Sequence, residues 1–120
     1  MRNSPHFIAY VLELMQGGSA ATARPMFGGH GIYVDGHIVG IVVADTLYLK
    51  TNDETRPAFL AHGLASFRYE KKSGPIEGTS YYEPPEEALE SRDAMREWLR
   101  LALSAALRAP SRKRKRKRKR

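Results

Sequence analysis

The fold is decided by residues 31–50, which read GIYVDGHIVGIVVADTLYLK. Two runs rich in β-branched and aromatic residues flank Asp35-Gly36, a pair that tolerates the positive φ angles of a type I′ turn and is a strong hairpin signal. Ala44-Asp45 offers a second, weaker turn before the next apolar run. With an extended Met26-Phe27 upstream, this segment predicts a three-stranded antiparallel meander.

Helical spacing of apolar residues surrounds the meander on both sides. Upstream, Ser4-Pro5 supplies an N-cap and a proline at the first helical position. The further elements expected are helices at about 5–15, 52–62 and 91–107 and strands at 67–70 and 79–83. The predicted fold class is two-layer α+β in the order α-β-β-β-α-β-β-α, with a five-stranded antiparallel sheet and helices mainly on one face.

Apolar residues point to both faces of the predicted sheet. If Asp35-Gly36 is a two-residue turn, Val34 pairs with His37 and His30 pairs with Ile41. Three helices in a chain this short cover only one face, so the other is expected to bind a partner, most simply a second copy of the chain. The predicted dimer face consists of Ile32, Val34, Val39, Ile41 and Val43. The alternative is that one helix crosses over, or that the turn is longer and the register shifts.

The chain ends in nine consecutive basic residues: Arg112, Lys113, Arg114, Lys115, Arg116, Lys117, Arg118, Lys119 and Arg120. So dense a run of like charge repels itself and buries no apolar surface. The sequence therefore predicts a domain at 1–110 and a disordered polybasic tail at 111–120, with Pro110 separating the tail from the last helix.

Charge divides the chain into two unlike parts. Nine of the 20 basic residues lie in the tail, which leaves 11 against all 13 acidic residues and gives the rest of the chain a net charge of −2. The tail should bind a polyanion: DNA, RNA or an anionic membrane surface. The alternative is a solubilising extension without function.

Other features limit the kinds of site to expect. Cysteine is absent, and no apolar stretch approaches the length of a membrane span, so we expect a cytoplasmic protein without membrane insertion. Gly28-Gly29-His30-Gly31 leads into a strand rather than a helix, which favours a tight bend over a phosphate loop. The predicted pairing separates His30 and His37 by roughly 13 Å, too far to share a metal ion. The sequence predicts no catalytic site, metal site or cofactor.

Two combined motifs carry a family resemblance. The run Arg24-x-Met26-Phe27-Gly28-Gly29-x-Gly31 and the later Tyr81-Tyr82-Glu83-x-Pro85 resemble the N-terminal domain of the TfoX/Sxy family, bacterial regulators associated with natural competence. The resemblance covers about residues 5–108 and implies a fold similar to secretion chaperones. The motif positions are Arg24, Met26, Phe27, Gly28, Gly29, Gly31, Tyr33, Asp35, Gly36, Lys71, Lys72, Tyr81 and Tyr82.

The resemblance implies a non-enzymatic role in transcription regulation. Family regulators carry a second domain and act with a transcription factor, whereas here a basic tail follows the first domain. We therefore expect a dimeric regulator or nucleoid-associated accessory protein that contacts nucleic acid through its tail and a protein of the transcription machinery through its body. The alternatives are a chaperone-like interaction module with an inert tail, an enzyme using the Gly28–Gly31 bend and Tyr81-Tyr82, and a nucleic-acid site around Arg24, Lys50, Lys71 and Lys72.

Overall fold

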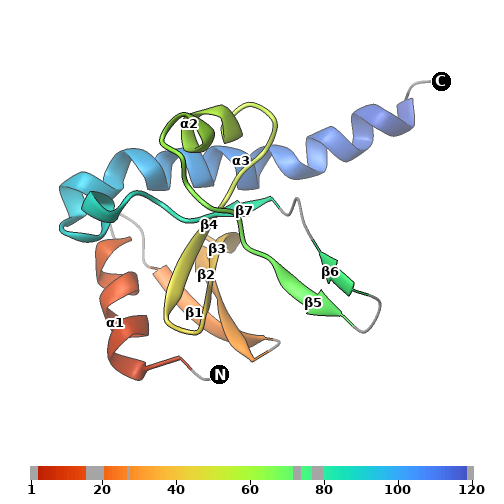
Figure 1. Ribbon diagram of the computed structural model, residues 1–120. Coiled ribbons are helices and arrows are strands. Elements are labelled where there is room, and N and C mark those ends of the chain that lie inside the picture. Colours follow the sequence, from red (N-terminus) through yellow and green to blue (C-terminus); the bar gives the residue numbers. More distant parts are fainter. Residues whose placement is uncertain (1–2, 16–20, 27, 72–73, 77–79, 119–120) are drawn as a thin grey trace.

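The computed structural model describes residues 3–15, 21–26, 28–71, 74–76 and 80–118 (Figure 1). These residues form an α+β fold, as the sequence predicts. The helices are α1 (Pro5–Leu14), α2 (Arg56–Ala61), the 3₁₀ helix η1 (Glu86–Leu89) and α3 (Arg92–Arg118). The strands are β1 (Ala21–Met26), β2 (Gly29–Val34), β3 (His37–Val43), β4 (Thr46–Lys50), β5 (Tyr69–Lys71), β6 (Gly74–Ile76) and β7 (Tyr81–Tyr82).

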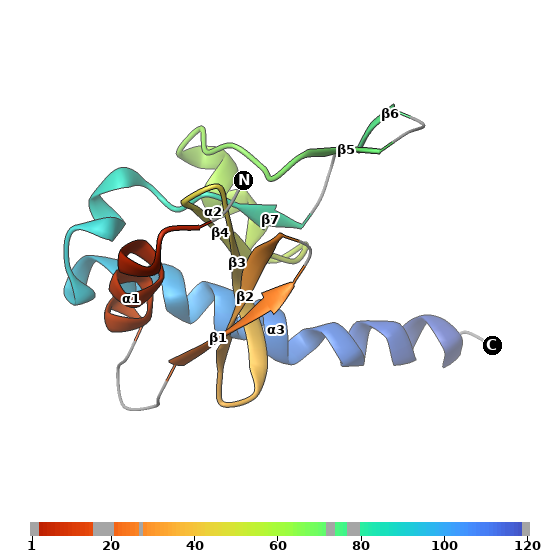
Figure 2. The ribbon, with the colours of Figure 1, turned by 90° about the horizontal axis from the view of Figure 1, so that it is seen from below.

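The main sheet has five antiparallel strands in the order β1-β2-β3-β4-β7. Its meander has four strands rather than the three expected, because residues 21–26 pair along β2 as an additional strand. The predicted strand at 67–70 does not join the sheet as a full strand. Ser66 forms an isolated bridge with Tyr82, after which the chain leaves to form the separate β5–β6 hairpin, which projects from the body (Figures 1 and 2).

A β-bulge in β3 changes the predicted register. The turn at Asp35-Gly36 forms as expected, with φ angles of 53° and 80°, and Val34 pairs with His37. Tyr33 then pairs with Ile38, but Ile32 pairs with Gly40, so Val39 is an extra residue. Beyond this point His30 lies opposite Val42 rather than the predicted Ile41. Because side chains alternate along a strand, one extra residue moves every later side chain of β3 to the opposite face.

This shift corrects the predicted dimer face. Ile32, Val34 and Val39 are 0–3% exposed and belong to the hydrophobic core, whereas Ile41 and Val43 lie on the other face of the sheet. Downstream of the bulge the core face is instead built from Val42, Leu47 and Leu49.

Helices cover the core face of the sheet. The helix α3 packs across β3 and β4, while α1 packs against β1 and α3 (Figure 1). The helix α2 places Phe59 against Trp98 of α3, with ring centroids 5.0 Å apart, and against Tyr82 at 6.0 Å. The buried residues in the described part of the helices are Val11, Leu14, Phe59, Ala88, Met95, Trp98, Ala102, Ala105 and Ala106. The prediction of helices on one side of the sheet is therefore correct.

The last helix is longer than the sequence suggested. Ser91 caps its start, since the Ser91 hydroxyl accepts a hydrogen bond from the Ala94 N–H at 3.1 Å. The helix continues through Pro110 to Arg118, so the predicted end at Leu107 is corrected. The division into a domain at 1–110 and a disordered tail at 111–120 stays a prediction. Proline removes one helical hydrogen bond, but Arg and Lys are good helix formers and resume the helix after it. No helix in the described part of the chain is both long and apolar enough to cross a lipid bilayer.

Candidate functional site

The face of the sheet opposite the helices gathers aromatic, apolar and basic side chains, and we call it the open face. Strand register and alternation place on it Arg24, Met26, Tyr33, Ile38, Ile41, Val43, Tyr48, Lys50 and Tyr81. Gly31 lies in its middle: a Cβ built there would be 2.9 Å from Sδ of Met26, 3.1 Å from Cε1 of Tyr33 and 3.3 Å from Cδ1 of Ile38. A side chain at position 31 would push these three groups apart, so this glycine lets them pack together.

Two basic side chains lie over tyrosine rings on this face. The guanidinium carbon of Arg24 is 4.7 Å from the ring centre of Tyr33, and Nζ of Lys50 is 5.2 Å from that of Tyr81. Both distances fall within the range of a cation–π attraction. Lys50 and Tyr81 are direct cross-strand partners. Arg24 is a diagonal cross-strand neighbour of Tyr33, because it lies two residues along β1 from the residue that pairs with Tyr33. The sheet thus holds each cation against a ring.

A pair of aromatic side chains extends the open face beyond β7. Tyr48 and Phe67 meet edge to face with ring centroids 5.1 Å apart. Phe67 is positioned by its backbone N–H, which donates to the Tyr81 carbonyl at 2.7 Å. The irregular segment before β5 therefore supplies an aromatic side chain to the same surface.

Two phenols of the open face, those of Tyr48 and Tyr81, have a raised pKa. Burial raises the pKa of Tyr81 above its ordinary value of 10.0, and the nearby Tyr33 phenol adds to the rise. Burial also raises the pKa of Tyr48, with a further contribution from the charge of Glu83 and a smaller opposing one from the Thr46 hydroxyl. The neutral form of the phenol is therefore favoured at Tyr48 and Tyr81.

The glycines of the family motif have structural roles. Gly28 has a φ of 78°, which suits glycine, and a Cβ at Gly29 would lie 2.5 Å from the Val42 carbonyl oxygen. The backbone therefore forms the predicted tight bend rather than a phosphate loop. Of the remaining motif residues, Tyr82 packs towards the core beside Phe59, and Lys71 lies in β5. Phe27 and Lys72 lie outside the described residues.

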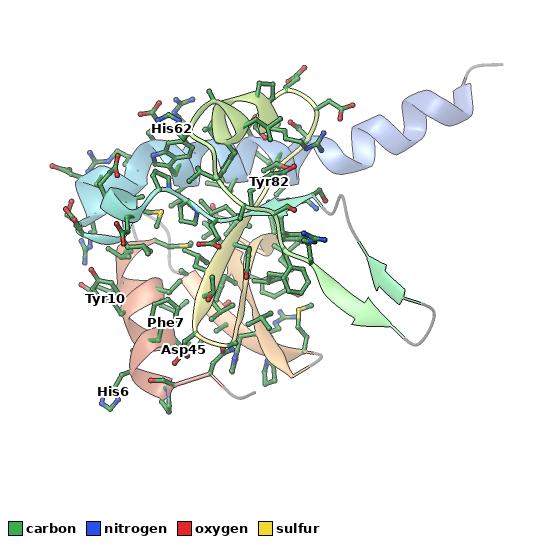
Figure 3. All side chains as sticks on the ribbon, in the orientation of Figure 1. His6, Phe7, Tyr10, Asp45, His62 and Tyr82 are labelled. Carbon is green, nitrogen blue, oxygen red and sulfur yellow. The ribbon has the colours of Figure 1, made fainter. Side chains whose placement is uncertain are left out.

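The histidines are dispersed over the fold. Nδ1 of His30 accepts a hydrogen bond from the Asn3 amide at 2.9 Å, and His62 stacks edge-on to Trp98 at 5.1 Å. Figure 3 shows His6 at the start of α1 and His62 at the far side of the molecule. Within the described ranges, no three His, Asp or Glu side chains come together as a metal site would require.

The structure reveals a contact that sequence reasoning missed. The same Asn3 nitrogen donates to the Val42 carbonyl at 2.8 Å, and Oδ1 of Asn3 accepts from the Asp45 N–H at 2.9 Å. Oδ1 of Asp45 in turn accepts from the Ser4 N–H at 2.6 Å. Asn3 and Asp45 are 42 residues apart, and no local pattern pairs them.

The basic segment stands apart from the open face. Residues 112–118 continue α3 beyond the sheet, and both views show this end of the helix projecting from the body (Figures 1 and 2). Lys119 and Arg120 lie outside the described residues. The structure thus separates two candidate surfaces, the open face and the basic end of α3.

The family relationship rests on the greater part of the chain. A family model for the TfoX N-terminal domain matches residues 13–106, from α1 into α3. No curated protein shows significant similarity to the chain. The matched region contains the entire sheet, the open face and the glycine bend of the motif. The chain therefore belongs to the TfoX N-terminal domain family.

Proposed function

We propose that this protein is a non-enzymatic regulatory or accessory protein that binds nucleic acid, without sequence preference, through the basic end of α3. One observation carries the proposal: nine consecutive Arg and Lys residues follow a body of net charge −2, and residues 112–118 of this run continue α3 away from that body. The family membership supports the regulatory role.

Counterion release explains why such a segment would bind. Each phosphate neutralised by Arg or Lys frees condensed cations from duplex DNA, which makes binding favourable and strongly dependent on salt. Phosphate contacts fix position but carry no base information, so affinity should be similar for unrelated sequences. The body, being acidic, adds repulsion rather than attraction at long range.

The salt dependence of duplex binding tests this proposal. Full-length protein should show a slope of log affinity against log salt of roughly −4 to −8, nearly independent of sequence. A variant with all nine basic residues replaced by Gln should lose most of this slope. The matched control replaces Arg96 and Arg100, which lie on α3 within the body, and should keep it. Undiminished duplex binding by the nine-Gln variant would overturn the proposal.

A second candidate function is a protein-interaction module of the chaperone-like kind with an inert basic end. The observation that favours it is the open face, whose apolar residues Ile38, Ile41 and Val43 are only partly buried. We also propose a homodimer and a protein partner in the transcription machinery. A role in competence and a cytoplasmic or nucleoid location are proposals of the same kind. Since Ile32, Val34 and Val39 lie inside the core, a dimer through the sheet would rest on Ile41 and Val43 alone among the residues predicted for it.

A further inference from the structure

We propose that the open face is a stacking surface for single-stranded nucleic acid. The inference rests on the proposed nucleic-acid function, because both surfaces would take the same polymer, but it assigns a second site with a different preference. The open face combines basic side chains with aromatic rings.

Aromatic rings are the first requirement of such a surface. Tyr33, Tyr48, Phe67 and Tyr81 come from β2, β4, the segment before β5, and β7, and all lie on the same side of the sheet. Strand register places Tyr33 and Tyr81 on the same face although their strands are not neighbours in the sheet. Unpaired bases stack on exposed aromatic rings of sheets in this manner, and every base has a face that can do so.

Positive charge is the second requirement. Arg24 and Lys50 lie over the rings of Tyr33 and Tyr81, so each cation is part of the aromatic surface against which a base would stack. A guanidinium group can stack its flat face on a base while the N–H groups at its edge donate hydrogen bonds to phosphate. Glu83 lies near Tyr48 and reduces the charge at one end of the surface. We therefore place the phosphates on the side of Arg24 and the bases over the rings.

Charge also argues against a second copy as the occupant. In a symmetric dimer formed through this face, Arg24 and Lys50 of both copies would enter one interface. Four cations would then be desolvated together, with Glu83 as the acidic residue identified on each surface. A polyanion bound to one copy meets Arg24 and Lys50 with opposite charge. The surface therefore suits a nucleic-acid strand better than its own copy.

The strand must be single because a duplex hides its base faces. Bases in a duplex are stacked on each other, so a rigid sheet surface reaches only phosphates and sugars. The basic end of α3, in contrast, takes single and double strands alike. A preference for single strands over duplex is therefore the signature of the open face.

The experiment uses the full chain and two probes, a 12-nucleotide thymidine strand carrying one 2-aminopurine and a 12-base-pair duplex. Wild type should bind the single strand more tightly and change the 2-aminopurine fluorescence as the base stacks. Replacing both Tyr33 and Tyr81 with Leu should weaken single-strand binding about tenfold and leave duplex binding unchanged. Replacing both with Phe keeps the rings and should retain binding. Arg24→Gln should weaken single-strand binding, and the matched Arg96→Gln on α3 should not.

Each result separates the two proposals. Equal affinity for single strand and duplex in the wild type, or an unchanged single-strand affinity in the Leu variant, overturns the open-face site. Loss of duplex binding in the nine-Gln variant with retained single-strand preference supports both proposals, whereas retained duplex binding overturns only the role of the basic end. If the wild type is a dimer that Ile41→Lys dissociates while single-strand binding is unaffected, the open face is a self-association surface and this inference is wrong. Thermal unfolding of each variant confirms that it is folded.

Discussion

Asn3 and His30 are joined by a hydrogen bond of 2.9 Å between the side-chain amide and Nδ1 of the imidazole. An amide nitrogen can only donate, so Nδ1 must accept and the ring proton of neutral His30 resides on Nε2. Asn3 also bonds the Val42 carbonyl and the Asp45 N–H. The Asn3 side chain therefore connects the start of the chain to β2, to β3 and to the turn between β3 and β4. Ala44 and Asp45 of that turn both have positive φ, a strained conformation for residues with side chains, and Asn3 helps to hold it.

Removing the hydrogen bonds of the Asn3 side chain should destabilise the whole domain. Asn3→Ala deletes three hydrogen bonds, of which the one to the Asp45 N–H supports a strained turn. We expect a loss of about 1–3 kcal/mol in the free energy of unfolding, measured by urea denaturation. His6→Ala, at an exposed position in the first turn of α1, is the control and should change stability by less than about 0.5 kcal/mol. Equal stability of the Asn3 variant and wild type would show that these bonds contribute nothing net.

The bulge at Val39 predicts opposite outcomes for neighbouring substitutions. Val39 is fully buried, so Val39→Lys places an unpaired charge in the core and should cost more than about 3 kcal/mol or prevent folding. Ile41 lies on the open face, and Ile41→Lys should fold with a loss of about 1 kcal/mol. Urea denaturation and far-UV circular dichroism distinguish the two. Equal effects of the two substitutions would contradict the bulge, because a regular strand places residues 39 and 41 on the same face.

Burial of Tyr81 links stability to high pH. Its folded-state pKa lies above the ordinary value of 10.0, so the unfolded chain ionises first as the pH rises. Stability from this group is complete below pH 10 and is lost between that value and the folded-state pKa. Tyr81→Phe should therefore flatten the decline of unfolding free energy above pH 10. The check is urea denaturation at several alkaline pH values, and an ultraviolet titration in which the variant lacks a late-ionising phenol. An unaltered alkaline decline would contradict the assignment.

The basic end should contribute little to the stability of the body. The last core residue described is Ala106, and the sheet, the open face and the bulge all precede it. Ending the chain at Pro110 should leave the thermal midpoint within about 2 °C of the full-length value, as measured by calorimetry. This also tests the predicted division into a domain at 1–110 and a tail at 111–120. A large drop would show that the basic segment docks on the acidic residues at 86–90.

Local chemistry made much of the fold predictable. The Asp35-Gly36 turn, the Ser4-Pro5 helix start and the fold class all depend on residues close together in sequence, and all appear as predicted. The fourth strand of the meander was missed because Ala21–Met26 holds few β-branched residues and one proline, and it becomes a strand by pairing with β2. The end of α3 was misplaced because proline is a strong but not absolute helix breaker.

By itself, the sequence determined the family, the α+β class, the turns and the separation of a −2 body from a basic end, since each is a property of short segments or of charge counts. Only the tertiary structure decided which apolar residues are core. Strand alternation converts a single extra residue into an exchange of faces, and the bulge at Val39 arises where β3 packs between β2 and β4 under α3. The same packing brings Arg24, Tyr33, Lys50 and Tyr81 from four strands to one surface. Residues so distant in sequence leave no local pattern from which their contacts could be predicted. These contacts form only when the strands assemble into the sheet.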